Sequence, residues 1–279
     1  MVFRLFRELL LPRDTGQSST RTSPNTAKDF LNPQPDALWR WLPSRCAICR
    51  SWPENPLCDT CISRFAAPVQ RCRTCALPLN TGPDNTLTPC GACLKNPPPL
   101  DACLCATPYA WPWIDLITQL KFHQQPGWAG PLATLLGSVP GADDVIEEAD
   151  WLLPIPLSAE RLSERGYNQS LLLARQLHSG KTDAHLLLRT RHTPAQRTLP
   201  RTERLANLVG AFAVDPLRSH QVQGRRIVLI DDVMTSGASL HTAARELRRA
   251  GATHISAIVL ARTEAATEQA MEPPPATPR

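Results

Sequence analysis

The chain has 279 residues, of which 42% are hydrophobic and 20% are charged, a composition that supports a packed core and excludes global disorder. The length suits one mid-sized domain and a smaller one, and no apolar run reaches the about 18 residues of a membrane-spanning helix. The formal net charge is +5. Metal-bound cysteine thiolates would lower it, so charge alone identifies no partner.

Residues 1–37 begin with a short amphipathic stretch and continue as a segment rich in Pro, Ser, Thr, Asn and Asp. This composition predicts a disordered N-terminal segment. The first stretch has Arg and Glu among its apolar residues and lacks the pattern of a signal peptide. We therefore expect a cytoplasmic protein.

Residues 38–106 contain all ten cysteines, eight of them in four C-x-x-C pairs. The eight are Cys46, Cys49, Cys58, Cys61, Cys72, Cys75, Cys90 and Cys93. Two such pairs complete a tetrahedral site with four sulfur ligands. The pattern therefore predicts a double zinc ribbon with two structural Zn²⁺ ions.

The spacing of the cysteines leaves their pairing open. Sequential pairing gives one site from the first two C-x-x-C pairs and a second from the last two, but interleaved pairing is also compatible. Three alternatives are less favoured. Disulfides would be unusual in a chain without a secretion signal, and redox-active C-x-x-C pairs do not normally occur in four copies. Iron–sulfur ligation by the cysteines is the third. Cys103 and Cys105 remain, and we expect buried free thiols.

The middle of the chain alternates between helical and extended patterns. Residues 107–140 have apolar side chains at helical spacing, and residues 160–178 do so as well, with an interruption at Gly166. Residues 151–156 are an apolar run that ends in prolines, which predicts a buried strand. Residues 189–204 contain five arginines and one acid, which predicts either a phosphate-binding loop or a solvated surface.

The C-terminal third predicts a strand, a helix and a second strand. Residues 226–230 and 254–260 are β-branched apolar runs, and residues 239–250 have helical periodicity, with Gly251 as the expected C-cap. A β-α-β unit implies a parallel sheet covered by helices. The polar, Pro-rich residues 264–279 predict a disordered tail.

Two acids and a small-residue loop join the first of these strands to the helix. Backbone amides in a loop before a helix can bind an anion, and Gly237 lets the backbone approach it closely. Asp231 and Asp232 are acceptors at the carboxyl end of the strand, where they suit ribose hydroxyls. The plain alternative is an ordinary turn with two solvated acids.

Segment 227–239, IVLIDDVMTSGAS, resembles the phosphoribosyl pyrophosphate (PRPP) signature of type I phosphoribosyltransferases. The resemblance implies that Asp231 and Asp232 are catalytic and bind the ribose hydroxyls. It assigns the following residues to the PRPP site, the last five of them to the 5′-phosphate: Val233, Met234, Thr235, Ser236, Gly237, Ala238 and Ser239.

Further motifs stand in a characteristic order. They are the four C-x-x-C pairs, Lys121-Phe122, Pro154-Ile155-Pro156-Leu157, Arg165-Gly166-Tyr167-Asn168-Gln169, and then Gln196, Leu199, Arg204, Asn207 and Phe212. Over about residues 41–263 this order resembles the ComF family of competence proteins. The resemblance implies an α/β fold with a parallel phosphoribosyltransferase-like sheet and flanking helices at 107–263, preceded by the zinc-ribbon domain at 38–106.

The same resemblance extends the site and implies a role. It adds Lys121, Pro156, Leu157, Arg165 and Arg204 to the PRPP-binding residues, with Mg²⁺ accompanying PRPP. It implies uptake and handling of single-stranded DNA in natural competence, with helicase or pore proteins of that machinery as partners. An authentic phosphoribosyltransferase in nucleotide metabolism with purely structural zinc, and a PRPP-sensing regulator, are the alternatives. No aromatic residue follows Phe212 to stack an acceptor base, so the acceptor and the transfer activity stay open.

Overall fold

The computed structural model of the protein describes residues 44–79, 88–190 and 210–264. The described residues belong to one compact unit. Segment 1–37, Arg204 and the tail beyond Glu264 lie outside the described ranges, and so do Gln196, Leu199 and Asn207. Across those ranges, every helix is too short or too polar to cross a lipid bilayer.

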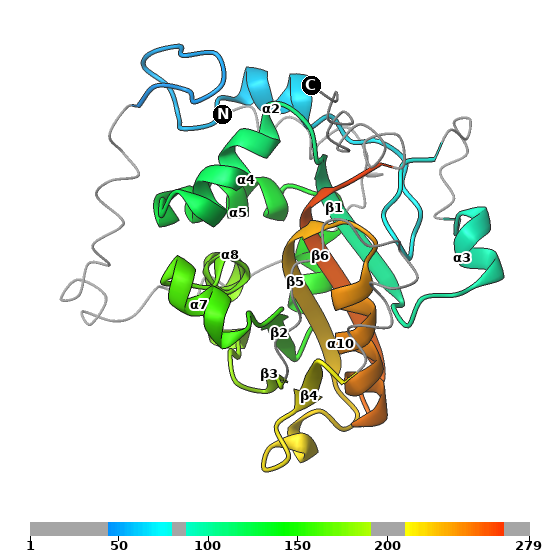
Figure 1. The fold of residues 1–279 in the computed structure, drawn as a ribbon. Helices are drawn as coiled ribbons and strands as arrows, with labels where there is room; N and C mark the ends of the chain where they lie inside the picture. The colour runs from blue at the N-terminus through cyan, green and yellow to red at the C-terminus, as the bar shows by residue number, and fades with distance from the viewer. Residues whose placement is uncertain (1–43, 80–87, 191–209, 265–279) are drawn as a thin grey trace, which may run out of the picture. The chain divides into compact units, whose positions relative to one another are not determined.

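A four-stranded parallel sheet lies at the centre, with the strand order β1-β6-β5-β2 (Figure 1). Its strands are β1 (Ala102–Pro108), β2 (Trp151–Pro154), β5 (Arg226–Met234) and β6 (His254–Arg262). The predicted parallel sheet is confirmed. β5 and β6 are longer than the sequence predicts because they stay paired until Met234 lies opposite Arg262.

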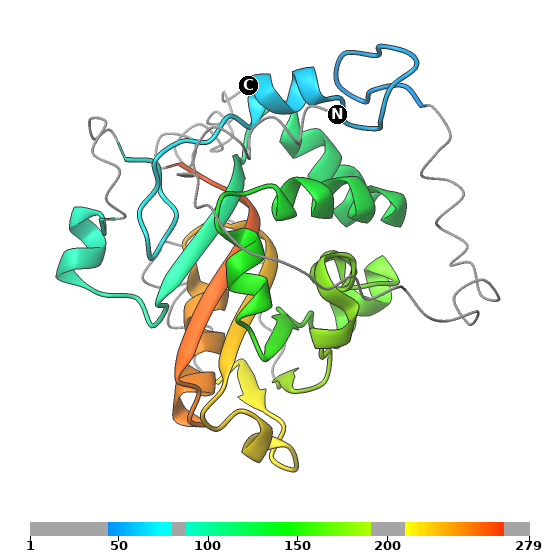
Figure 2. The same cartoon turned by 180° about the vertical axis from the view of Figure 1, so that it is seen from behind.

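Helices cover both faces of this sheet (Figures 1 and 2). Alternate residues of each strand point to opposite faces, so Val228 and Ile230 pack under one set of helices, while Ile227 and Leu229 pack under another. The first set is α4 (Trp113–Phe122), α5 (Ala129–Gly137) and α8 (Gln169–His178), and the opposite face carries α10 (Ala238–Arg249). The fold therefore has three layers.

The remaining elements are short. An antiparallel pair, β3 (Leu187–Arg189) with β4 (Phe212–Val214), forms a small second sheet. The other helices are α2 (Asp59–Phe65), α3 (Gly91–Lys95), α6 (Ala142–Glu147) and α7 (Ala159–Arg165), with single turns η2 (Pro126–Trp128), η3 (Ser179–Lys181) and η4 (Ser219–Gln221).

Three local features differ from the sequence prediction. The helical region 107–140 is divided, because its first residues belong to β1 and Pro126 begins a separate turn before α5. The helix predicted at 160–178 is also divided, since Gly166 caps α7 with a φ of 78°, a conformation that favours glycine. Cys103 and Cys105 are buried free thiols, as predicted, and they lie in β1, a strand that the sequence analysis missed.

The two cysteine-rich segments pack on opposite faces of the sheet. Leu57 of the first segment belongs to the same apolar cluster as helices α4 and α5. Cys72, Cys75 and Ala76 of the second segment belong to the cluster beneath α10. Each segment is thus part of a different half of the core, and the predicted domain limits at 38–106 and 107–263 stay a prediction.

Candidate functional site

The acid pair lies where β2 leaves the sheet. β2 pairs with β5 only as far as Pro154 opposite Ile230, so Asp231 and Asp232 follow at the point where β5 loses this neighbour. The crevice outside the carboxyl ends of parallel strands is the usual ligand site of open α/β sheets. The order of the strands therefore places both acids at such an edge.

Each acid has a distinct set of partners. Asp231 Oδ1 accepts hydrogen bonds from Ser170 Oγ at 3.1 Å and from the Asp232 amide at 2.9 Å. Asp232 Oδ1 lies 2.9 Å from Lys121 Nζ and accepts from the Val233 amide at 2.6 Å. Asp232 Oδ2 is buried and accepts no hydrogen bond from any residue in the described ranges. A buried carboxylate oxygen of this kind is suited to a hydroxyl or a cation of a ligand.

The electrostatics of the pair follow from burial. Loss of hydration, together with the neighbouring Asp232 carboxylate, raises the pKa of Asp231 to about 7, and the Lys121 ammonium opposes the rise. Two adjacent carboxylates that share one lysine leave the protein with a site that favours additional positive charge or hydrogen-bond donors.

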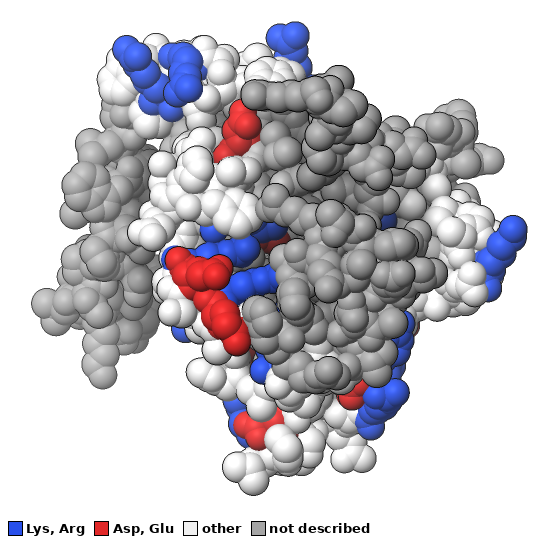
Figure 3. All heavy atoms as spheres, in the orientation of Figure 1, with Lys and Arg blue, Asp and Glu red and all other residues white. Residues whose placement is uncertain are grey.

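Basic side chains from other elements surround the acids. The guanidinium of Arg165, at the end of α7, lies 4.9 Å from the Phe122 ring centre, and Nη1 donates to Gln169 Oε1 at 3.0 Å. Burial lowers the pKa of Arg165, and the charge of Asp232 opposes this. Figure 3 shows Lys and Arg side chains in a hollow beside α7 and α8, with acidic side chains at its edge.

The segment between α7 and α8 holds this arrangement together. The Tyr167 hydroxyl donates to the Leu120 carbonyl at 2.5 Å, next to Lys121. The Asn168 side chain caps α8 and donates to the Ile155 carbonyl at 3.0 Å. These bonds join α4, the end of β2 and α8, which supplies Ser170. Of the residues in the 165–169 motif, only Arg165 was predicted to bind the ligand.

The loop at residues 235–237 joins β5 to α10, and we call it the anion loop because the sequence predicts that it binds a phosphate. Gly237 is the N-cap of α10 with a φ of 78°, and a Cβ there would lie 2.5 Å from Met234 Cε and 2.9 Å from the His241 ring. Only glycine fits this position. The Ala238 amide donates to Ser236 Oγ at 3.4 Å. The N-terminus of a twelve-residue helix thus follows a close-packed, small-residue loop, as the sequence predicts.

The loop between β2 and α7 begins next to the acids, because the Ile155 amide donates to the Ile230 carbonyl at 2.9 Å. Pro156 and Leu157 follow and are half-buried. Arg189 of β3 donates to the Pro156 carbonyl at 3.5 Å. Burial and the Arg161 charge lower the pKa of Arg189, and the Asp231 carboxylate opposes this. Arg189 therefore lies close enough to the acids to interact with Asp231, whereas the sequence placed it only in an Arg-rich loop.

The eight cysteines gather in two groups of four with sequential pairing. The groups are Cys46, Cys49, Cys58 and Cys61, and Cys72, Cys75, Cys90 and Cys93, and within each the sulfurs lie within 4.8 Å of one another. Four sulfurs about 2.3 Å from one zinc ion would be about 3.8 Å apart. Both groups therefore fit a tetrahedral metal ion whose four coordination positions are all filled by cysteine sulfurs.

Each cysteine group combines a turn with the start of a short helix. Cys58 caps α2, and Cys90 caps α3. The Cys90 amide donates to Cys72 Sγ at 3.2 Å. Burial acts to raise the pKa of Cys72, but amide hydrogen bonds from Cys90 and Thr74 lower it to about 6. Amides directed at the sulfur stabilise the thiolate, which is the form that binds metal.

The second group also contacts the anion loop through one buried arginine. Arg262, which is 4% exposed, donates through Nε to the Cys75 carbonyl at 3.1 Å. Its Nη1 donates to the Met234 carbonyl at 3.0 Å and to the Thr235 carbonyl. One guanidinium therefore ties the Cys72–Cys75 turn to both residues that precede Ser236.

Comparison with known proteins identifies the family. A family model for the phosphoribosyl transferase domain matches residues 169–273. The chain is 33% identical over 235 residues to the DNA utilization protein YhgH of Escherichia coli (strain K12), a match that covers 80% of this chain and 98% of that protein. It is 32% identical over 227 residues to Competence protein F of Haemophilus influenzae, covering 78% and 96%. The chain belongs to the ComF family.

A third member of the ComF family, Competence protein ComFC of Bacillus subtilis, is 40% identical over 113 residues, covering 40% of this chain and 44% of that protein. The resemblance inferred from the motifs is thus confirmed. In this ComF-family chain the structure brings Lys121 and Arg165 to the acid pair and sets the loop beside them, while Arg204 lies outside the described residues.

Proposed function

We propose that this ComF-family chain binds PRPP with Mg²⁺ and acts in the uptake and handling of single-stranded DNA during natural competence. The proposal rests on one observation: the acid pair, a lysine, an arginine and the anion loop lie together at one edge of the sheet. Asp231 and Asp232 lie beside Lys121 and Arg165, next to the anion loop. PRPP offers the matching groups, which are ribose hydroxyls, a 5′-phosphate and a pyrophosphate.

The residues have separate roles in this proposal. Asp231 and Asp232 accept hydrogen bonds from the ribose hydroxyls, and the otherwise unbonded Asp232 Oδ2 is suited to one of them. Segment 235–239 holds the 5′-phosphate with its amides and hydroxyls. Arg165, Pro156 and Leu157 border the pyrophosphate, whose charge Mg²⁺ neutralises when bound. Lys121 neutralises Asp232 in the ligand-free protein and is a further cation for the pyrophosphate.

Two observations support the DNA part of the proposal. Similar proteins bear the names DNA utilization protein and Competence protein F. The first cysteine-rich segment and its surroundings also expose aromatic rings, since Trp52 is 61% and Trp111 62% exposed. Phe65 packs edge-on against Trp111, with the Arg64 guanidinium 5.2 Å from its centre. Exposed rings beside arginines are suited to stacking unpaired bases.

Calorimetric titration of the zinc-loaded protein with PRPP and Mg²⁺, with and without single-stranded DNA, tests the proposal. The Asp231→Ala Asp232→Ala variant should bind PRPP at least about a hundredfold more weakly, because two charge-assisted hydrogen-bonding groups are lost. Asp143→Ala Asp144→Ala is the matched control, since this second acid pair is exposed on α6. Equal PRPP affinity in both double variants would contradict the ribose assignment.

The DNA arm of the titration separates the alternatives. A PRPP affinity that changes when DNA is present indicates that the protein couples the binding of PRPP to the binding of DNA. An affinity indifferent to DNA, with pyrophosphate released when a nucleobase is supplied, would instead indicate a phosphoribosyltransferase of nucleotide metabolism. PRPP binding with neither DNA coupling nor pyrophosphate release would indicate a PRPP-sensing regulator.

A further inference from the structure

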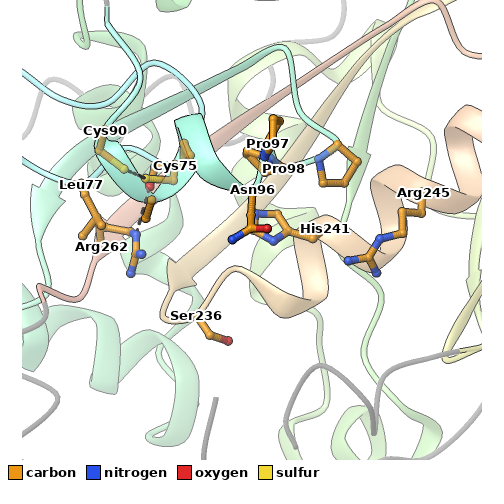
Figure 4. A pocket seen from close by; sticks show the side chains of 13 residues that line it. Cys75, Leu77, Cys90, Asn96, Pro97, Pro98, Ser236, His241, Arg245 and Arg262 are labelled. Atoms are coloured by element: carbon orange, nitrogen blue, oxygen red, sulfur yellow. Dashed lines mark hydrogen bonds between the residues drawn. The ribbon is translucent and has the colours of Figure 1, made fainter. Parts of the chain in front are cut away.

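A cavity of about 510 Å³ lies on the α10 face, between the second cysteine group and the anion loop. Its walls come from the turn around Cys75, from the segment that follows α3, from Ser236 of the loop and from α10 (Figure 4). Pockets of about 300–1,000 Å³ are typical of small-molecule sites. The volume is therefore large enough for a nucleotide-sized ligand.

The side chains that line the cavity from α10 and β6 are mostly basic, while three metal-ligand cysteines line its other end. Arg245, Arg262 and His241 line the cavity, and no Asp or Glu is among its lining residues in the described part of the chain. Figure 4 shows Arg245 on the same side of α10 as His241. Arg245 is exposed and forms no ion pair with any described residue, whereas Arg248 and Arg249 on the same helix each have an acidic partner. The Arg245 guanidinium is thus available to a phosphate.

Part of the lining is apolar. Pro97, Pro98 and Pro99 line the cavity in sequence, and Asn96, which precedes them, lies beside His241 (Figure 4). Proline rings offer an apolar surface for a planar base, and an amide can hydrogen-bond to the edge of that base. Basic side chains next to apolar proline rings in a cavity of this size suit a phosphate linked to a nucleobase.

We propose that this cavity binds one nucleotide unit, with its phosphate at Arg245 and His241 and its base against Pro97–Pro99. The site differs from the PRPP site, because the acid pair does not line it. Ser236 lines the cavity and belongs to the loop, so the two sites share one residue. The ligand is either a free nucleotide or a residue of a DNA single strand, and only the second source rests on the proposed function.

The test uses the full-length, zinc-loaded chain and two probes, thymidine 5′-monophosphate and a short oligothymidylate. Because a nucleotide resembles part of PRPP, all titrations are made in the Asp231→Ala Asp232→Ala background, which removes the ribose-binding acids. In that background, Arg245→Ala should weaken nucleotide binding by about tenfold, the effect of losing one charge-assisted contact. Alanine favours helix, so α10 should stay folded.

The matched control is Arg249→Ala, an exposed arginine of the same helix that pairs with Glu246 and does not line the cavity. Its nucleotide affinity should be unchanged. Mononucleotide binding that depends on Arg245 identifies a free nucleotide as a ligand, and stronger Arg245-dependent binding of the oligonucleotide identifies a strand residue. Binding of both probes unaffected by Arg245→Ala, or weakened equally by Arg249→Ala, would overturn the proposal. Neither outcome depends on whether PRPP binds.

Discussion

The two four-cysteine groups share a sequence pattern, yet they connect to the rest of the molecule in different ways. The first group is joined to the sheet through Phe65, whose carbonyl accepts a hydrogen bond from Trp113 Nε1 at 2.8 Å. Trp113 begins α4, and Lys121 lies in its last turn, so this route reaches Asp232 along most of a helix. The second group is joined to the anion loop by the hydrogen bonds of Arg262.

This comparison shows that one metal-binding pattern can support a site in two ways. On the α4 side, the cysteine group supports a helix that positions a lysine. On the α10 side, it holds the carbonyls of the loop itself and forms a wall of the nucleotide cavity. We therefore expect damage to the second group to affect phosphate binding more than damage to the first. The experiments below test this expectation, from the largest expected effect to the smallest.

Cys75→Ser should have the largest effect. Cys75 is 6% exposed and packs in the core beneath α10, so loss of this metal ligand should lower the free energy of unfolding by about 4 kcal/mol. The matched variant is Cys49→Ser, in an exposed position of the first group, where we expect a loss of about 2 kcal/mol. Urea denaturation and zinc content measure both, and PRPP affinity should fall only in Cys75→Ser. Equal effects would remove the distinction between the groups.

Arg262→Lys tests the direct connection. A lysine cannot reproduce the forked donation to Cys75 and Thr235, so we expect PRPP affinity to fall about tenfold and the free energy of unfolding by about 2 kcal/mol. Both zinc ions should be retained. Arg248→Lys is the control, because Arg248 pairs with Asp101 away from the loop. If Arg262→Lys binds PRPP as tightly as Arg248→Lys does, the hydrogen bonds of Arg262 do not hold the anion loop in its PRPP-binding conformation.

Local sequence patterns predicted the individual elements around the site but not the contacts between them. The β-branched run in β5, the helical periodicity of α10 and the C-x-x-C pairs are short-range signals, and all three elements exist. Arg262 gave no such signal, because its partners Cys75 and Thr235 are remote in the sequence and lie in different elements. β1 was missed because its apolar residues are Ala, Cys and Leu, without the β-branched apolar residues that are typical of strands.

The surroundings of the acid pair also could not be predicted from local sequence patterns. Acids are unfavourable in strands, so the sequence predicted that β5 ends before Asp231, whereas pairing with β6 extends it to Met234. Lys121 entered the predicted site through the family resemblance. Its distance to Asp232 depends on how α4 packs on the sheet, and no local pattern contains that information. Ser170 was missed for the same reason.

The pH dependence of PRPP binding tests how ionisation of Asp231, on the α4 face of the sheet, affects the ligand. The pKa of Asp231 is about 7 because of burial and the Asp232 charge, so the folded protein holds this proton up to about neutral pH. Ribose hydroxyls donate to the ionised acid. PRPP affinity should therefore rise with pH, by up to about tenfold per unit below pH 7, and level off above it. Folding stability should change in the opposite direction, since this group favours the folded state only while protonated.

Lys121→Met should sharpen this result. The Lys121 charge lowers the pKa of Asp231, so its removal should move the levelling-off of affinity to higher pH. Lys181→Met is the matched control, because Lys181 pairs with Glu147 at the surface. Calorimetry in buffers of different ionisation enthalpy measures the protons released, and the phosphates of PRPP contribute equally to both variants. An unchanged profile in Lys121→Met would show that α4 does not tune the acids.

Trp113→Phe should have the smallest effect, and it tests whether the first cysteine group influences the site through α4. Trp113 is 1% exposed, and the variant keeps most of its packing while removing the hydrogen bond to the Phe65 carbonyl. We expect the free energy of unfolding to fall by about 1 kcal/mol and PRPP affinity to stay within about twofold. Trp128→Phe is the control, since its Nε1 donates to Gln119 Oε1 at 2.8 Å, which is not part of the cysteine-rich segment. A fall in PRPP affinity specific to Trp113→Phe would show that the first group acts on the acids as directly as the second group acts on the loop.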